Sequence, residues 1–257
     1  GAPARALGGA VYVTARSGTP WLEQQKLTAS DAAAGDGFGV RVAISGETVV
    51  GGAWQDDHAG GSDAGSAYVF VRSGTSWSQQ QKLTASDAAP GDNFGLALAI
   101  DGETLLVGAP FHEDGGFTDA GAAYAFVRSG TAWSEQQQLN ASDAAGSDWF
   151  GYSLALVGDR ALVGVPNDDI VEPNAGSARL FARSGTTWSE QGTATASDGS
   201  QGDAYGTSAA LSIDSGLVGA FTDDLPPGGG SAGSAYVLRL EPGTPVSYCT
   251  AGTSASG

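Results

Sequence analysis

Acidic residues recur in pairs along the chain, and loop carboxylates of this kind could bind a cation. Two aspartates five residues apart precede each Phe-Gly or Tyr-Gly dipeptide, and a second acidic pair follows each Gly-Ala-Pro-like triplet. Carboxylate oxygens are ligands that Ca²⁺ prefers, so Ca²⁺ is the one cofactor that the sequence indicates. In the competing interpretation each Asp caps a turn by accepting a backbone N–H two residues further on, and recurrence in every unit favours this structural role. The candidate metal ligands are Asp31, Asp36, Asp87, Asp92, Asp143, Asp148, Asp198, Asp203, Asp56, Asp57, Asp168 and Asp169.

The candidate ligand-binding residues are aromatic and histidine side chains that occur once rather than in every unit. Trp54 stands where other units have Pro or Phe, and Trp149 aligns with Asn93. A single aromatic side chain in a loop is a typical binding hot spot. His58 and His112 lie at non-equivalent positions in the loops after the triplets, where we expect solvent-exposed side chains. The alternative for both is transition-metal binding together with a neighbouring carboxylate.

Four other tryptophans do repeat, each three residues after the Gly of an Arg-Ser-Gly string. Such a Trp is expected to pack over its own hairpin, with sugar stacking as the alternative. The four are Trp21, Trp77, Trp133 and Trp188.

Nucleophile motifs lack the context that catalysis needs. Residues 229–233 match the Gly-x-Ser-x-Gly pattern, but they lie in a Gly/Pro-rich loop and no His follows them. Cys249 also has no downstream His. The recurring Arg residues belong to the hairpins of the units, whereas a sialidase propeller needs an arginine cluster in a central pocket. We therefore expect no enzymatic activity.

The charge balance excludes two classes of partner. The formal net charge is −17 over 257 residues, which repels nucleic acid and anionic membrane surfaces. No run of 18 or more apolar residues is present, so membrane insertion is not expected. The sequence has one Cys and no Met, and it shows no signal peptide. We expect either that a targeting segment has been removed or that the sequence is a fragment.

A fixed repeat of about 56 residues determines the architecture. The string Arg-Ser-Gly-Thr recurs at Arg16, Arg72, Arg128 and Arg183, with spacings of 56, 56 and 55. The aromatic-Gly dipeptide and the Gly-Ala-Pro-like triplet recur at the same intervals. Each unit reads as four short strands separated by turn residues, which predicts an antiparallel meander. Stacking such sheets around an axis buries both of their faces, so the fold class is all-β, a β-propeller of four-stranded antiparallel blades.

The units do not complete a ring of four-stranded blades. The first is expected to supply strands three and four, and the last strands one to three, for a total of 17 strands. We therefore expect an incomplete part of a larger propeller, completed by further blades from a missing part of the chain. The units lie near 1–28, 38–84, 94–140, 150–195 and 205–240, and 241–257 form a Pro/Gly/Ser-rich tail.

The same markers carry a family resemblance over about residues 1–240. Phe38-Gly39, Gly108–Pro110 and the string at Gly65–Phe70 resemble the FG-GAP repeats of integrin α-chain propellers and of secreted bacterial proteins. The resemblance implies a secreted or surface-bound propeller that is used for binding. It does not carry over the integrin-type calcium loop, which resembles Asp-x-Asp-x-Asp-Gly between the first and second strands, because this chain has a tight turn there.

We conclude from the sequence that the chain is a binding or adhesion module at the cell surface or outside a bacterial cell. It is expected to recognise a protein or glycan through loops on one rim, since the loops differ between units while the strands do not. The alternatives are a structural spacer in a large surface protein, or a lectin-like or hydrolase-accessory propeller.

Overall fold

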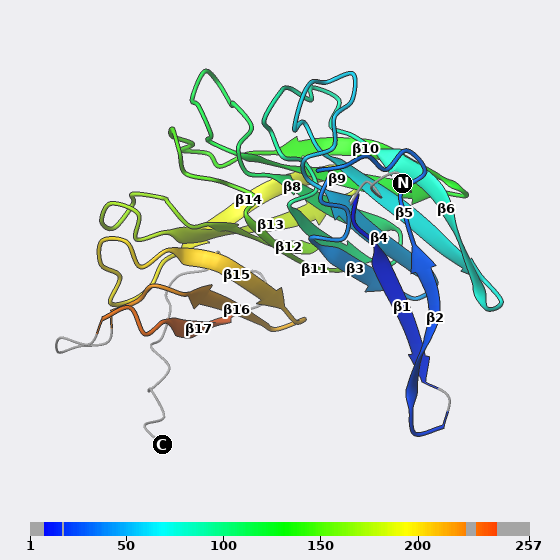
Figure 1. The fold of residues 1–257 in the computed structure, drawn as a ribbon. Helices are drawn as coiled ribbons and strands as arrows, with labels where there is room; N and C mark the ends of the chain where they lie inside the picture. Colours follow the sequence, from blue (N-terminus) through cyan, green and yellow to red (C-terminus); the bar gives the residue numbers. More distant parts are fainter. Residues whose placement is uncertain (1–7, 17, 225–229, 241–257) are drawn as a thin grey trace.

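The computed structural model describes residues 8–16, 18–224 and 230–240, and their regular structure is entirely β. Seventeen strands form five antiparallel sheets that follow one another in an open arc (Figure 1). No helix in these ranges is long and apolar enough to cross a membrane. The prediction of an all-β propeller with four-stranded blades is confirmed.

Three sheets have four strands in meander order, as the repeat predicts. Each begins after an aromatic-Gly dipeptide and ends with the strand that carries the repeated Trp. The first complete sheet is β3 (Val42–Ser45), β4 (Thr48–Ala53), β5 (Ser66–Ser73) and β6 (Ser76–Leu83). The second is β7 (Ala97–Asp101), β8 (Thr104–Ala109), β9 (Ala122–Ser129) and β10 (Ala132–Leu139). The third is β11 (Ser153–Val157), β12 (Arg160–Val165), β13 (Ser177–Ser184) and β14 (Thr187–Ala194).

The two end sheets have fewer strands, in the numbers that the sequence predicts. The first pairs β1 (Val11–Arg16) with β2 (Trp21–Leu27), which correspond to strands three and four of a complete sheet. The last has β15 (Tyr205–Leu211), β16 (Ser215–Ala220) and β17 (Ser234–Arg239), which correspond to strands one to three.

The glycines of the repeated dipeptide and triplet allow successive sheets to touch. A Cβ on Gly52 would lie 2.0 Å from the carbonyl oxygen of Gly95 in the next sheet, and one on Gly108 would lie 2.1 Å from that of Gly151. Gly95 also has a φ of +97°, a conformation that side chains other than Gly rarely adopt. The motif therefore recurs because each sheet-to-sheet junction needs a close backbone approach.

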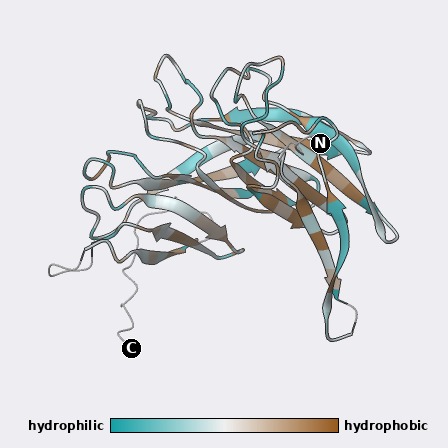
Figure 2. Cartoon of the chain, in the orientation of Figure 1, coloured by the Kyte–Doolittle hydropathy of each residue, from teal (hydrophilic) through white to brown (hydrophobic). Residues whose placement is uncertain are grey.

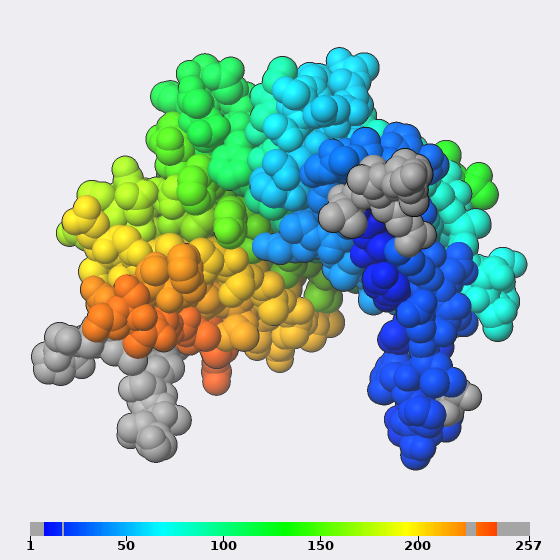
Figure 3. Space-filling model, viewed as in Figure 1, coloured from blue at the N-terminus to red at the C-terminus, as the bar shows by residue number. Residues whose placement is uncertain are grey.

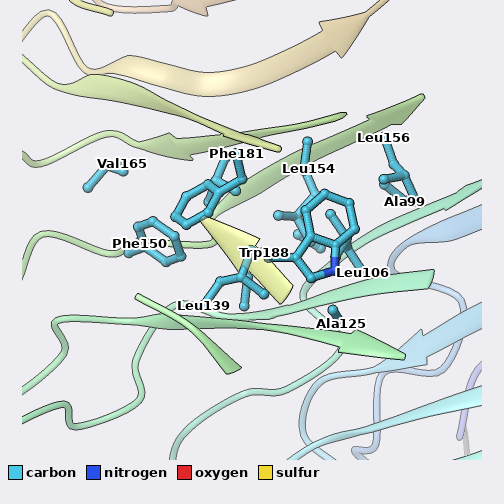
Figure 4. Packing of buried hydrophobic residues seen from close by; sticks show 14 of the residues in the cluster. Ala99, Leu106, Ala125, Leu139, Phe150, Leu154, Leu156, Val165, Phe181 and Trp188 are labelled. Carbon is cyan, nitrogen blue, oxygen red and sulfur yellow. The ribbon is translucent and has the colours of Figure 1, made fainter. Parts of the chain in front are cut away.

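The hydrophobic core consists of four clusters, one at each junction between successive sheets. Figure 4 shows the cluster in which Phe181 and Trp188 of the third complete sheet lie over Leu106 and Ala125 of the second. The fourth strands, such as β6, are mostly hydrophilic and contribute only a few residues such as Trp77 and Leu83 to the core, whereas β4 is strongly hydrophobic (Figure 2). Burial of one sheet by the next thus stabilises the array.

The outer face of the last sheet shows which apolar residues a following sheet would cover. Leu217 and Val237 are 44% and 50% exposed, whereas the equivalent Leu106 is fully buried against the following sheet. No sheet among the described residues covers this last apolar face.

Candidate functional site

The strand order divides the loops between two ends of the sheets. Turns such as β3–β4 and β5–β6 lie at one end, because neighbouring strands are antiparallel. The β4–β5, β8–β9, β12–β13 and β16–β17 loops lie at the other end, together with the connections between sheets. We call this second end the loop face. Its longer loops project from the top of the molecule in Figure 3, and all the predicted site residues lie in its segments.

In the first complete sheet the predicted aspartates from separate segments meet around one tyrosine. The hydroxyl of Tyr68 donates to Asp31, 2.8 Å away, and to Asp56, 3.3 Å away. Asp56 also accepts a hydrogen bond from the hydroxyl of Ser66 at 2.6 Å. Asp36 lies in the same connection as Asp31 and is almost fully buried. Each carboxylate in this cluster therefore has a protein donor.

The second Asp of each pair has the same structural role in every unit. Its Oδ2 accepts the backbone N–H of the residue three positions earlier, rather than two positions later as the sequence predicted. This bond closes the turn just before the aromatic-Gly dipeptide. The four bonds are Ala33–Asp36 at 2.5 Å, Ala89–Asp92 at 2.8 Å, Ala145–Asp148 at 2.8 Å and Ser200–Asp203 at 2.6 Å.

A different side chain closes the acidic cluster in each complete sheet. The Lys82 ammonium group lies 2.7 Å from both Asp31 and Asp56. In the second sheet His112 takes the position of Asp56, with its Nδ1 3.1 Å from Asp92 and its Nε2 3.5 Å from Asp87.

In the third sheet an arginine takes the position of the tyrosine. Arg179 is 2% exposed and bonds Asp143 at 2.8 Å and Asp168 at 2.5 Å. In the last sheet the hydroxyl of Tyr236 donates to Asp198 at 2.8 Å and to Asp223 at 2.9 Å. Each cluster thus has an internal donor, and in the first and third sheets this donor carries a full positive charge.

This arrangement does not fit a resident Ca²⁺ in the first and third complete sheets. A Ca²⁺ between Asp31 and Asp56 would take the place of the Lys82 ammonium group, and Arg179 is engaged in the same way with Asp143 and Asp168. Across the described part of the chain, no group of three or more His, Cys, Asp or Glu residues could hold a metal ion. The outer aspartates cap their own loops instead, since Asp57 accepts the N–H of Asp63 at 2.8 Å and Asp169 that of Asn174 at 2.7 Å.

The two candidate histidines have different environments. His58 closes its own loop, with its ring nitrogens 3.0 Å from the carbonyl of Gly65 and 3.0 Å from the N–H of Gly60. His112 is 7% exposed, so the expectation of a solvent-exposed side chain was wrong for this residue. The reason is its alignment with Asp56, which places it inside the acidic cluster.

Burial and charge shift the pKa of several groups on the loop face. Burial alone would lower the pKa of His112, but the hydrogen bond to Asp92 and the charges of Asp92, Asp87 and Asp114 raise it above the ordinary value. Burial also raises the pKa of Asp148 to about 6, although the hydrogen bond from Ala145 opposes the shift.

The repeated tryptophans join successive sheets, a role that the sequence did not indicate. The side chain of Gln81 donates to the carbonyl of Trp133 at 2.9 Å and accepts its N–H at 2.8 Å. The indole of Trp133 donates to Gln80 at 3.2 Å, and the Arg128 guanidinium of its own hairpin lies over the ring. The same contacts hold Trp77 and Trp188. These three rings are buried, whereas Trp21 is 68% exposed.

One of the two predicted one-off tryptophans belongs to an aromatic cluster on the loop face. Trp149 has two aromatic neighbours: its ring centroid is 5.5 Å from that of Phe111 and 6.0 Å from that of Tyr152. Trp54 packs over Gly37, whose added Cβ would lie 2.5 Å from the indole nitrogen. Both tryptophans are half-buried.

Two predictions fall on segments outside the described residues. Cys249 and the rest of the 241–257 tail lie there, as does Gly229 of the Gly-x-Ser-x-Gly match.

Comparison with known families identifies the repeat. The FG-GAP repeat matches four successive segments, residues 21–70, 77–126, 133–181 and 188–238, which together make up more than half of the chain. The chain belongs to the FG-GAP repeat family. A search of curated proteins found no match. FG-GAP repeats occur in extracellular and adhesion-type domains.

Each FG-GAP repeat spans a junction between two sheets. The first match begins at Trp21 on the outer strand β2 and ends at Phe70 on β5 of the next sheet. It contains Asp31, Asp56 and Tyr68, so most of an acidic cluster lies within one repeat. Lys82 comes from the following repeat, so charge neutralisation in this cluster couples neighbouring FG-GAP units.

Sequence reasoning missed the residues that complete these sites. Lys82 gave no such signal, because the first unit has Lys26 at the equivalent position. The signal for Arg179 was present, because it breaks the repeat at a position where the other units have a tyrosine. Phe111 and Tyr152 are likewise one-off aromatics, at positions occupied by Gln55 and by Val40 in the first unit. A search for aromatic departures from the repeat at every loop position would have found both.

Proposed function

We propose that the chain is a non-enzymatic binding module that acts outside the cell or at its surface and holds a protein or glycan ligand on the loop face. One observation carries this proposal. The one-off aromatic side chains gather on the loop face, while the sheets beneath it repeat nearly the same contacts three times. A scaffold with irregular side chains at one end is the usual form of a binding domain.

The surface chemistry of the loop face supports binding rather than catalysis. Its buried carboxylates make structural contacts with a backbone N–H, a tyrosine, a serine or a cation. The aromatic side chains are half-buried and available for contact. The membership of the FG-GAP family supports an extracellular setting.

The test compares blockage of the loop face with blockage of the opposite end. In a Cys249→Ser background, Ser62→Cys and Phe117→Cys place a bulky maleimide polymer on exposed positions of the loop face. Thr131→Cys places the same polymer on the exposed β9–β10 turn at the opposite end. Each labelled protein is applied to arrays of extracellular proteins and of glycans.

We expect the unlabelled chain to bind at least one array component. The polymer at Ser62 or Phe117 should abolish that signal, and the polymer at Thr131 should leave it unchanged. Absence of any signal would favour the spacer function instead, and a signal lost only with the Thr131 label would refute the assignment to the loop face.

A further inference from the structure

We propose that Phe111, Trp149 and Tyr152 form a subsite that binds one ring of a neutral sugar. The subsite rests on the proposed function, since it assigns a ligand class to part of the loop face. Phe111 comes from the β8–β9 loop of the second complete sheet, and Trp149 and Tyr152 precede β11 of the third. The cluster therefore bridges two successive sheets.

The geometry combines a nearly parallel pair of rings with a perpendicular one. The rings of Trp149 and Tyr152 are 17° from parallel, and that of Phe111 stands at 84° to the indole. None of the three residues belongs to the four core clusters. The three rings thus lie outside the hydrophobic clusters that are buried between the sheets.

The fold does not require an aromatic side chain at any of the three positions. In the other units the position of Trp149 holds Gly37, Asn93 and Ala204, and the first and last units have Val40 and Thr207 at the position of Tyr152. The other units have Gln55, Asn167 and Thr222 in place of Phe111.

The backbone conformation at position 149 is unfavourable for a tryptophan. Its φ is +62°, in a region where a bulky side chain is unfavourable and Gly or Asn is preferred. The equivalent Gly37 and Asn93 have φ values of +68° and +55°. A tryptophan at this position is therefore better explained by ligand binding than by a requirement of the fold.

The polar atoms of the cluster are free to bind a ligand. Neither the indole N–H of Trp149 nor the hydroxyl of Tyr152 has a hydrogen-bond partner among the described residues. No buried side-chain N or O atom in that part of the chain lacks a partner, so both groups must reach solvent. Asn167 stands beside them, since its N–H bonds the carbonyl of Asp148 at 3.3 Å, and its side-chain amide is also unpaired among the described residues.

A sugar ring matches these features because it has an apolar C–H face and polar hydroxyl groups at its edge. The aromatic rings can pack against the C–H face of the sugar. The indole N–H, the phenol and the side-chain amide can form hydrogen bonds with its hydroxyl groups. The net charge of −17 and the nearby carboxylate of Asp148 disfavour an anionic ligand, so the sugar is a neutral one.

The experiment uses the whole chain and an array of neutral oligosaccharides of glucose, galactose, mannose and N-acetylglucosamine. Sialylated and sulfated glycans and proline-rich peptides serve as comparison probes. Each array signal is followed by titration of the free probe, monitored by tryptophan fluorescence and by calorimetry. The variants are Trp149→Asn, which copies the residue at the equivalent Asn93, and the control Ile213→Asn, which changes an exposed side chain in the β15–β16 turn at the opposite end of the sheets.

We expect a neutral oligosaccharide to bind and Trp149→Asn to weaken its binding by about tenfold or more, as for a hot-spot aromatic. Ile213→Asn should change the affinity by less than about twofold, because Ile213 lies at the end of the sheets opposite the loop face. Both variants should keep the wild-type melting temperature within a few degrees, which separates loss of the subsite from loss of the fold.

Three results would overturn the sugar subsite. The first is that no neutral oligosaccharide binds at millimolar concentration. The second is that Trp149→Asn leaves the binding unchanged, and the third is that only the proline-rich peptides give a signal that depends on Trp149. If a protein or an anionic glycan binds the loop face without needing Trp149, the proposed function stands and the sugar subsite does not.

Discussion

The ammonium group of Lys82 lies 2.7 Å from the carboxylate of Asp56, whose side chain is only 4% exposed. Burial alone would lower the pKa of Lys82, but its hydrogen bonds with Asp31 and Asp56 outweigh burial and raise it. Lys82 therefore stays charged at neutral pH and places a positive charge between aspartates that would otherwise repel one another.

Lys82→Met should destabilise the chain by about 1–3 kcal/mol, because Asp56 would keep its buried charge without a cationic partner. Urea unfolding measures the change. Lys26→Met is the matched control, since Lys26 occupies the equivalent position but contacts only the ring of Tyr12 among the described residues. The control should lie within about 0.5 kcal/mol of wild type. Equal losses in the two variants would contradict the role of Lys82.

His112 should make stability depend on pH above the ordinary histidine value. Its pKa is raised in the folded chain, so the folded state holds the proton more tightly than the unfolded state. This stabilisation is fully present below pH 6.5 and is lost as the pH rises through the folded pKa. As the pH rises above 6.5, the melting temperature of the wild type should therefore fall further than that of His112→Gln. Parallel pH profiles of the two proteins would refute the prediction.

Asp148→Asn should stabilise the chain at neutral pH. Burial raises the pKa of Asp148 to about 6, so ionisation costs stability as the pH rises from 3.8 to about 6. Asn removes the charge and keeps an oxygen that can accept the N–H of Ala145. We expect a gain of about 1–2 kcal/mol at pH 7.5 and no difference near pH 3.5, measured by chemical unfolding. A loss at pH 7.5 would show that the carboxylate itself is needed.

Gln81→Ala should cost about 1–3 kcal/mol, because the backbone N–H and carbonyl of Trp133 would both lose their partner. Gln191→Ala removes the same side chain from β14, where it bonds only residues of its own strand. That control should change the free energy of unfolding by less than about 0.5 kcal/mol. Similar effects of the two substitutions would show that the contact between sheets is not a source of stability.

The repeat made the fold predictable, because strand positions, turns and glycine contacts recur in register through four units. The side chains that complete the acidic clusters were less predictable, because they differ between units and act across long sequence separations. Lys82 reaches Asp31 from 51 residues away, and nothing local to either residue shows the pairing. The aromatic cluster was missed in part for the same reason, since Phe111 and Trp149 meet only when two sheets stack.

The central claim is that repeated residues build the fold whereas one-off residues bind the ligand. The stability of Trp149→Asn tests this claim most directly, and the measurement requires no ligand. Its free energy of unfolding should lie within about 1 kcal/mol of wild type, because relief of the left-handed backbone offsets the lost ring contacts. Trp133→Ala, in the core, should lose about 3–5 kcal/mol in the same assay. A loss for Trp149→Asn as large as that for Trp133→Ala would show that Trp149 serves the fold and would contradict the claim.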